Sequence, residues 1–315
     1  MIRGSGATLL AGNLLSFLSC TSSSNTNEEI VPTQDNKCPF RISLNTSTIS
    51  GYKLPVREQI ELCAEAGFDG IELWVRDVET YMQEGGTPEE IAQLLKDSNL
   101  ILENMISFSN WIADDPEKRE EGCRNMQKDM ELTARLGGKY IAAPVQGLIS
   151  FDRNKLSEYA DRYKVILETG DRTGVTPILE LWGAGHLNQL SDTIHIATGT
   201  GHPHATMLLD FYHLYRGGNS FDSLRLIHGA ALPVFHINDY PTTPERTRLN
   251  DSDRVLPGDG ICPFDELLPI LYQSGFRGAL SVELFNKTYW ETMDVREVLR
   301  KSYEKTARVI EQAMK

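Results

Sequence analysis

Four residues that can bind a metal ion stand at the ends of short apolar runs in the second half of the chain. The four runs are Ile178-Leu179-Glu180, Leu208-Leu209-Asp210, Val234-Phe235-His236 and Ser281-Val282-Glu283. Burying three carboxylates together is costly unless a cation offsets their charge. Three carboxylates and one imidazole suit a single divalent ion such as Mn2+, Mg2+, Co2+ or Zn2+. The pattern therefore predicts one metal site, provided that the fold brings these four run ends together.

A metal site of this composition would suit chemistry beside a carbonyl group. A divalent ion bridging a carbonyl oxygen and a neighbouring hydroxyl stabilises the negative charge that remains when the adjacent carbon loses a proton. Return of the proton to the other face is epimerisation, and return to the next carbon is isomerisation. Expulsion of a leaving group is dehydration or another lyase reaction. All three share one intermediate, so the ligands alone do not distinguish them.

The elements that must position these residues are short strands alternating with amphipathic helices. Eight β-rich runs are predicted as strands: Phe40–Leu44, Gly70–Trp74, Ile101–Ser107, Tyr140–Pro144, Thr176–Leu181, Thr206–Asp210, Val234–Ile237 and Ala279–Glu283. Eight strand–helix units match a (β/α)8 barrel, whose usual size is about 250 residues. We therefore predict an α/β fold, a single-domain TIM barrel over residues 39–315, with its working residues at the carboxyl ends of the strands.

Helix signals support this alternation. Thr87-Pro88-Glu89-Glu90 predicts a helix start with a capping box. Further helices are expected near residues 221–229, after the sixth strand, and from residue 295 onward. A doubly wound open sheet would need a Gly-rich phosphate loop after its first strand, and residues 45–51 show no such pattern.

Several motifs in the chain resemble those of one known superfamily. The motifs are Gly67-Phe68-Asp69-Gly70-Ile71-Glu72, Ile178-Leu179-Glu180, Leu209-Asp210-Phe211-Tyr212-His213, Phe235-His236-Ile237-Asn238-Asp239-Tyr240, Pro257-Gly258-Asp259-Gly260 and Ser281-Val282-Glu283. From Phe40 to its end, the chain resembles the xylose isomerase-like barrel superfamily, in the branch of sugar phosphate isomerases and epimerases. The resemblance implies that Glu180, Asp210, His236 and Glu283 bind the metal. It also implies that Glu180 and Glu283 form an acid–base pair.

The resemblance also implies residues that bind substrate. His213, three residues after Asp210, matches a substrate-binding histidine, and Arg254, four residues before Gly258, matches an arginine near the second glutamate. Arg246 and Arg248 compete for that role. They lie in a link between His236 and Arg254 that is longer than in ketose 3-epimerases, so the substrates of that group are not carried over.

Other residues near strand ends are further candidates. Asp239 either orients His236 from behind or caps its own loop, and Glu72 and His186 also stand close to strand ends. Six aromatic residues follow strand ends and either wall a sugar pocket or pack between loops: Trp74, Phe108, Trp111, Trp182, Tyr240 and Trp290. Of these, Trp74 and Trp182 are predicted to contact substrate.

The amino-acid composition of the chain argues against some classes of binding partner. Asp and Glu outnumber Lys and Arg by 44 to 31, for a net charge of −13, which argues against a nucleic-acid partner. It also disfavours a metal-dependent endonuclease on the same barrel, since such enzymes gather more histidines and several zinc ions. A non-catalytic surface sugar-binding protein is the alternative outside enzymes. The oligomeric state is left open.

The first 38 residues are predicted to direct and tether the protein. Residues 1–20 combine Arg3, an apolar run and Leu18-Ser19-Cys20, as in an export signal of the lipoprotein type with a lipidated Cys20. Residues 21–38 would be a flexible polar tether. We therefore expect a periplasmic or membrane-anchored protein. Since phosphorylated sugars are mainly cytosolic, the expected substrate is an unphosphorylated sugar, keto-sugar, glycoside or cyclitol.

Overall fold

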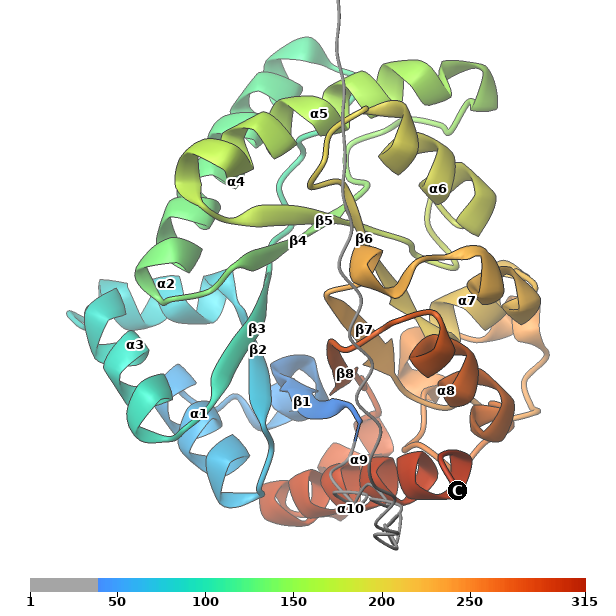
Figure 1. Ribbon diagram of the computed structural model, residues 1–315. Coiled ribbons are helices and arrows are strands. Elements are labelled where there is room, and N and C mark those ends of the chain that lie inside the picture. Colours follow the sequence, from blue (N-terminus) through green and yellow to red (C-terminus); the bar gives the residue numbers. More distant parts are fainter. Residues whose placement is uncertain (1–38) are drawn as a thin grey trace, which may run out of the picture. The chain divides into compact units, whose positions relative to one another are not determined.

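Eight parallel strands form a closed barrel in the computed structural model, which describes residues 39–315 (Figure 1). The strands are β1 (Arg41–Asn45), β2 (Gly70–Trp74), β3 (Ile101–Ile106), β4 (Tyr140–Pro144), β5 (Thr176–Glu180), β6 (Thr206–Asp210), β7 (Val234–Ile237) and β8 (Ala279–Val282). Each strand pairs with its neighbours in sequence, and β1 closes the barrel onto β8. The predicted single (β/α)8 barrel is confirmed. The strand bounds differ from the prediction by at most one residue.

Helices surround the strands (Figure 1). The α-helices are α1 (Val56–Glu65), α2 (Val75–Gln83), α3 (Pro88–Asp97), α4 (Pro116–Arg135), α5 (Leu156–Thr173), α6 (Leu190–Gly199), α7 (Phe211–Gly217), α8 (Phe264–Gln273), α9 (Lys287–Thr292) and α10 (Val295–Ala313). The predicted capping box is confirmed at α3. Thr87 Oγ1 accepts a hydrogen bond from the backbone N–H of Glu90, and Glu90 accepts one from the N–H of Thr87.

The prediction of an α-helix near residues 221–229 is wrong. This stretch holds a short 3-10 helix, Phe221–Leu226, and the α-helix that follows β6 is α7, which begins directly at Phe211. The side chain of Asp210 accepts a hydrogen bond from the N–H of His213 at 2.9 Å and so caps α7. Because the last strand residue is also the helix cap, no loop separates the two elements.

The barrel interior explains why the candidate ligands face one another. Six residues, one from each of β2 to β7, form a separate apolar cluster: Trp74, Ile106, Ala142, Ile178, Leu208 and Val234. Side chains two residues apart on a strand point to the same face. Glu180, Asp210 and His236 each come two residues after a member of this cluster. Their side chains therefore also face the barrel interior, one layer closer to the carboxyl ends of the strands than the apolar cluster.

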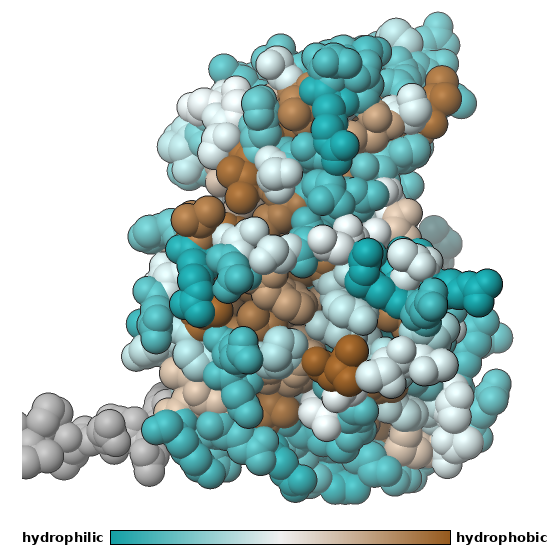
Figure 2. Space-filling model, turned by 90° about the vertical axis from the view of Figure 1, so that its right-hand side faces the viewer, coloured by the Kyte–Doolittle hydropathy of each residue, from teal (hydrophilic) through white to brown (hydrophobic). Residues whose placement is uncertain are grey.

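One face of the outside of the barrel is predominantly polar. Polar residues cover most of the face shown in Figure 2, and apolar residues lie between them. Of the cysteines within the described residues, Cys63 and Cys262 are buried and Cys123 is half-buried, and all three are free thiols. Within residues 39–315, no helix has the length and apolar character needed to cross a membrane. The predicted export signal, Cys20 and the tether lie outside the described residues.

Candidate active site at the carboxyl end of the barrel

The four predicted metal ligands are all buried at the carboxyl ends of neighbouring strands. Glu180 ends β5, Asp210 ends β6, His236 lies in β7 and Glu283 directly follows β8. Nδ1 of His236 lies 3.1 Å from Oε2 of Glu283 and 3.8 Å from Oδ2 of Asp210. Asp210, Glu283 and His213 also form a group whose potential ligand atoms all lie within 4.8 Å of one another. Glu180 and His236, the other two predicted ligands, do not belong to this group. The fold therefore gathers Asp210 and Glu283 beside the rings of His213 and His236.

Glu180 interacts electrostatically with Glu283, a member of this group. Burial raises the pKa of Glu180 to about 8, and repulsion by the carboxylate of Glu283 adds to the effect. Burial would also raise the pKa of Glu283, but attraction to His236 and Arg254 outweighs it and holds that pKa well below its ordinary value. The two glutamates therefore have strongly different proton affinities although they share one site.

Arg254 lies among the predicted ligands. Its Nη1 is 3.1 Å from Oδ2 of Asp210 and 2.6 Å from Oε2 of Glu283, and its guanidinium packs over the ring of Tyr212 at 4.4 Å. Its Nη2 donates to Nε2 of His213 at 3.1 Å. Only 1% of Arg254 is exposed, so this single cation offsets two buried carboxylates. Arg254 therefore lies beside the second glutamate, and its role in binding substrate stays a prediction.

The donor set fits a divalent cation. Nδ1 of His236 is buried and has no aligned hydrogen-bond partner, although it faces two carboxylates. Burial would lower the pKa of His236, but attraction to Glu283 and Glu72 outweighs it and raises that pKa, so a bound metal would take the place of the ring proton on Nδ1. Arg254 supplies the other positive charge against Glu180, Asp210 and Glu283. An unpartnered ring nitrogen beside carboxylate oxygens is the donor combination that Mn2+, Co2+ or Zn2+ prefers.

Glu72 holds His236 from the opposite side, a role that sequence reasoning did not assign to it. Nε2 of His236 forms a hydrogen bond with Oε2 of Glu72 at 3.2 Å, and Asn104 donates to the same oxygen at 2.7 Å. The hydrogen bond leaves Nδ1 of His236 directed toward Asp210 and Glu283. One signal in the sequence pointed to this position. Glu72 precedes Trp74 by two residues and therefore shares its inward face.

We expect Glu72→Gln to weaken metal binding by roughly 10–100-fold, the usual effect of losing a carboxylate behind a histidine ligand. The amide retains the size of the side chain but loses the charge that makes the imidazole a strong ligand. Titration of the metal-free protein with Mn2+ measures the affinity. Glu103→Gln is the matched control, because Glu103 on the same sheet pairs with Arg41 instead. Equal Mn2+ affinity in wild type and Glu72→Gln would contradict this role.

Asp239 caps its loop, which resolves the two alternatives left open by the sequence. Its carboxylate accepts hydrogen bonds from the backbone N–H groups of Tyr240, Gly258, Gly260 and Cys262, at 2.8–3.0 Å. A Cβ at Gly260 would lie 2.3 Å from Oδ1 of Asp239, so only glycine fits there. The contact orders the segment that follows Arg254.

Replacing Asp239 with Ala is expected to lower the free energy of unfolding by roughly 2–3 kcal/mol, because several buried N–H groups lose their charged acceptor. Urea denaturation followed by circular dichroism measures this change. Asp259→Ala, in the same loop but at the surface, is expected to cost under about 1 kcal/mol. Equal losses in the two variants would show that the cap contributes little.

One cavity of about 730 Å3 brings together the predicted catalytic and substrate-binding residues. Its lining includes Glu180, Glu283, His213, Arg254, Trp74 and Trp182. Asp210 and His236 do not line it. The long link after β7 contributes Arg248, Leu249, Asn250 and Asp251 to the lining. Arg246 does not line the cavity, since its guanidinium bonds to the backbone of Tyr215 and Arg216.

The aromatic candidates divide into two groups. Trp74, Phe108 and Trp182 line the cavity. Trp111 is fully buried and donates to the carbonyl of Pro144, Tyr240 stacks on Tyr215 at 4.1 Å, and Trp290 donates to the carbonyl of Thr48. These last three support loops and do not reach the cavity. His186 is exposed and also lies outside its lining.

Asn45 was missed by sequence reasoning. Its side-chain amide donates to Oε1 of Glu283 at 3.0 Å, and its carbonyl oxygen accepts from Nε1 of Trp74 at 3.0 Å. Asn45 thereby links a cavity wall to the second glutamate. Its position at the end of β1 was the only available signal, because the amide itself cannot serve as an acid or a base.

The chain is similar to several known proteins in sequence and in fold. The chain is 26% identical over 269 residues to an inosose isomerase of Bacillus velezensis, covering 81% of this chain and 92% of that protein. It is 28% identical over 202 residues to a 3-dehydroshikimate dehydratase of Bacillus anthracis, covering 59% and 68% respectively. The crystal structure of the IolI protein with a bound zinc atom superposes with a TM-score of 0.79 at 22% identity, covering 87% of this chain and 99% of that one. The model of the family described as xylose isomerase-like TIM barrel matches residues 60–311, and the chain belongs to this family.

Proposed function

We propose that this protein is a divalent-metal-dependent isomerase or epimerase of an unphosphorylated sugar, keto-sugar or related cyclitol. One observation carries the proposal. Two glutamates of strongly different proton affinity, Glu180 and Glu283, line one cavity beside a cluster of metal-type ligands. The similarity to an inosose isomerase, whose substrate is a keto-cyclitol, supports the substrate class.

The metal would be held by Glu180, Asp210, His236 and Glu283. When bound, it supplies a Lewis acid that stabilises negative charge on substrate oxygens. Asp210 and His236 lie outside the cavity lining, which suits residues that only hold the metal. The zinc in the IolI protein supports a divalent ion on this fold.

The two glutamates would move the proton. Glu283, whose pKa is held low by His236 and Arg254, is ionised and suits removal of a proton from the carbon beside the carbonyl. Glu180, with its raised pKa, suits donation of a proton. They stand on β5 and directly after β8, three strands apart around the barrel. Proton removal by one group and return by the other would invert a centre or shift the carbonyl.

His213 would bind substrate in its neutral form. Burial lowers the pKa of His213 well below its ordinary value, and the positive charge of Arg254 lowers it further. Arg254 donates to Nε2, so the ring proton resides on Nδ1. Nδ1 has no partner within the described protein and is therefore free to donate to a substrate oxygen.

A dehydratase or keto-glycoside lyase is the second candidate. It uses the same proton removal, followed by loss of a group from the next carbon. The similarity to a 3-dehydroshikimate dehydratase favours it specifically. A non-catalytic sugar-binding protein is disfavoured, because binding alone requires no pair of glutamates with opposed pKa shifts.

Solvent exchange tests the proposal. The Mn2+-loaded protein is incubated in D2O with inosose, a panel of ketoses and a 3-keto-glycoside, and the products are followed by NMR. Deuterium is expected to enter a carbon beside the carbonyl, to stop after chelation with EDTA and to resume on addition of Mn2+. Appearance of an unsaturated product would identify the dehydratase or lyase. Absence of exchange with every compound would overturn the enzymatic proposal.

We also propose export with lipidation of Cys20, on the basis of the signal in residues 1–20. Cell fractionation is expected to find the protein with membranes, and Cys20→Ser is expected to release it. Recovery of both forms in the cytosol would refute export.

A further inference from the structure

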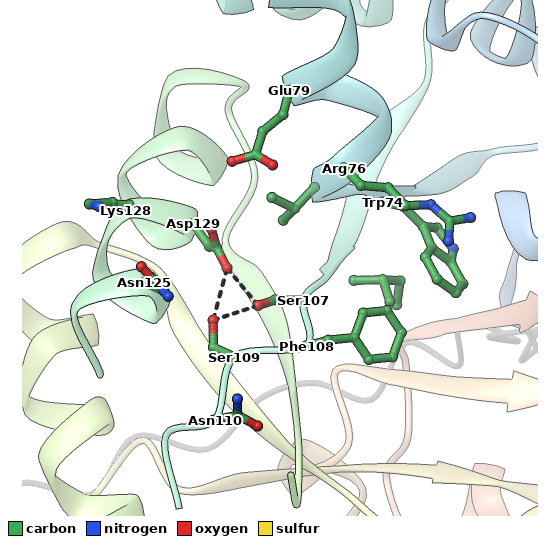
Figure 3. A pocket seen from close by; sticks show the side chains of 12 residues that line it. Trp74, Arg76, Glu79, Ser107, Phe108, Ser109, Asn110, Asn125, Lys128 and Asp129 are labelled. Atoms are coloured by element: carbon green, nitrogen blue, oxygen red, sulfur yellow. Dashed lines mark hydrogen bonds between the residues drawn. The ribbon is translucent and has the colours of Figure 1, made fainter. Parts of the chain in front are cut away.

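A second cavity, of about 440 Å3, adjoins the active-site cavity (Figure 3). It is lined by α2, by α4 and by the segment that follows β3. The two cavities share Trp74, Ile106 and Phe108 in their linings. Each volume by itself lies within the range of about 300–1,000 Å3 that is usual for small-molecule sites. The pair therefore offers more room than one small keto-sugar requires.

The carboxylate of Asp129 lines this second cavity. Oδ2 of Asp129 accepts hydrogen bonds from the hydroxyls of Ser107 at 2.6 Å and Ser109 at 3.1 Å, and the three side chains form the triangle drawn in Figure 3. Both serines are buried. Oδ1 of Asp129 has no partner among the described residues. A half-buried carboxylate that lines a cavity and has one unpartnered oxygen is a strong acceptor for a ligand hydroxyl.

The rim adds polar groups of both charges. Glu79 from α2 and Lys128 and Asn125 from α4 line the cavity and make no hydrogen bond or ion pair with any other described residue. Two acidic groups, Glu79 and Asp129, stand against two basic groups, Lys128 and Arg76. The near balance of charge favours a neutral ligand with many hydroxyls over a phosphate or another anion.

Aromatic rings connect the two cavities. Phe108 is 46% exposed, and its ring centre lies 5.1 Å from that of Trp74 and 6.1 Å from that of Trp182. A pyranose presents C–H groups on its faces, and these pack well against aromatic rings. The aromatic row thus provides a surface along which a ligand can extend from one cavity to the other.

We propose that the second cavity binds the distal part of a two-part carbohydrate, so that the substrate is a glycoside or disaccharide. This inference rests on the proposed function, in which the reacting sugar unit occupies the active-site cavity. Asp129 and Lys128 would bind hydroxyls of the distal unit, and Phe108 would pack between the two units.

Calorimetric titration of the Mn2+-loaded protein with glucose, cellobiose, maltose and lactose tests this inference. At least one disaccharide is expected to bind at least about tenfold more tightly than glucose. The double variant Asn125→Ala/Lys128→Ala is expected to weaken binding of that disaccharide by about tenfold and to leave glucose unchanged, since one or two hydrogen bonds are lost. Both positions are exposed, so folding should be unaffected. Lys164→Ala, on the exposed face of α5, is the control.

Asp129→Asn provides a second variant with the same expected pattern. Equal affinities for glucose and all the disaccharides, or equal losses for both ligand types in the variants, would overturn the inference. The result is separable from the exchange assay. Exchange without any disaccharide preference would support the enzymatic proposal and overturn the proposed role of the second cavity. A disaccharide preference without exchange would support that role and overturn the enzymatic proposal.

Discussion

Replacing either Glu180 or Glu283 with Gln is expected to lower the rate of solvent exchange into the substrate by roughly 10²–10⁴-fold, the usual contribution of one positioned acid or base. Gln keeps an oxygen that can face a metal, but it can neither accept nor donate the proton. Because the two residues would act in one sequence of proton transfers, the double variant is expected to be hardly slower than the slower single variant. NMR in D2O measures the rate for each protein.

Two controls make this experiment decisive. Glu168→Gln changes an exposed glutamate on α5 and is expected to retain full activity. The bound metal of every variant is measured by elemental analysis, because loss of metal would also stop the reaction. A Glu180→Gln or Glu283→Gln protein that holds its metal and keeps wild-type exchange would refute the paired-glutamate mechanism.

Removal of Arg254 is expected to have the largest effect on stability. Without metal, Arg254→Ala leaves the buried carboxylates of Asp210 and Glu283 without the cation that pairs with both. Breaking a buried ion pair on one side typically costs about 3–5 kcal/mol. Addition of Mn2+ should recover part of this loss, because a ligand that binds only the folded protein at 100 times its Kd contributes about 2.7 kcal/mol.

Urea denaturation with and without Mn2+ measures both effects. Arg308→Ala is the matched control, since Arg308 is exposed on α10 and pairs with no other described residue. It is expected to change the free energy of unfolding by less than about 0.5 kcal/mol. A loss below about 1 kcal/mol in Arg254→Ala, or a variant that Mn2+ does not stabilise, would show that Arg254 and the cation do not share these carboxylates.

Helix positions show where local sequence signals sufficed and where they did not. The capping box at Thr87 predicted the start of α3, because all of its hydrogen bonds lie within four residues. The helix α7 was missed because its cap, Asp210, is also the last residue of β6 and was read only as a metal ligand. Asp210 has two roles, and its sequence position was interpreted for only one of them.

The site shows the same division. Glu180, Asp210 and Glu283 could be predicted, since acidic side chains at the ends of consecutive strands of a barrel must meet at one rim. The residue that forms a hydrogen bond with Nε2 of His236 could not be predicted. Asp239 is nearer in sequence, yet its carboxylate accepts four backbone N–H groups of its own loop, and Glu72 approaches from β2 across the barrel.

The amino-acid sequence by itself determined the alternation of strands and helices, the closed barrel and the identity of the acidic strand ends. These follow from local periodicity and from the parallel geometry of βα units. Only the tertiary structure decided that Glu72 holds His236, that Arg254 pairs with two carboxylates, and that a second polar cavity opens beside Phe108. Each of these depends on distances between side chains from strands and loops far apart in the chain, and such distances are set by packing, which no local pattern encodes.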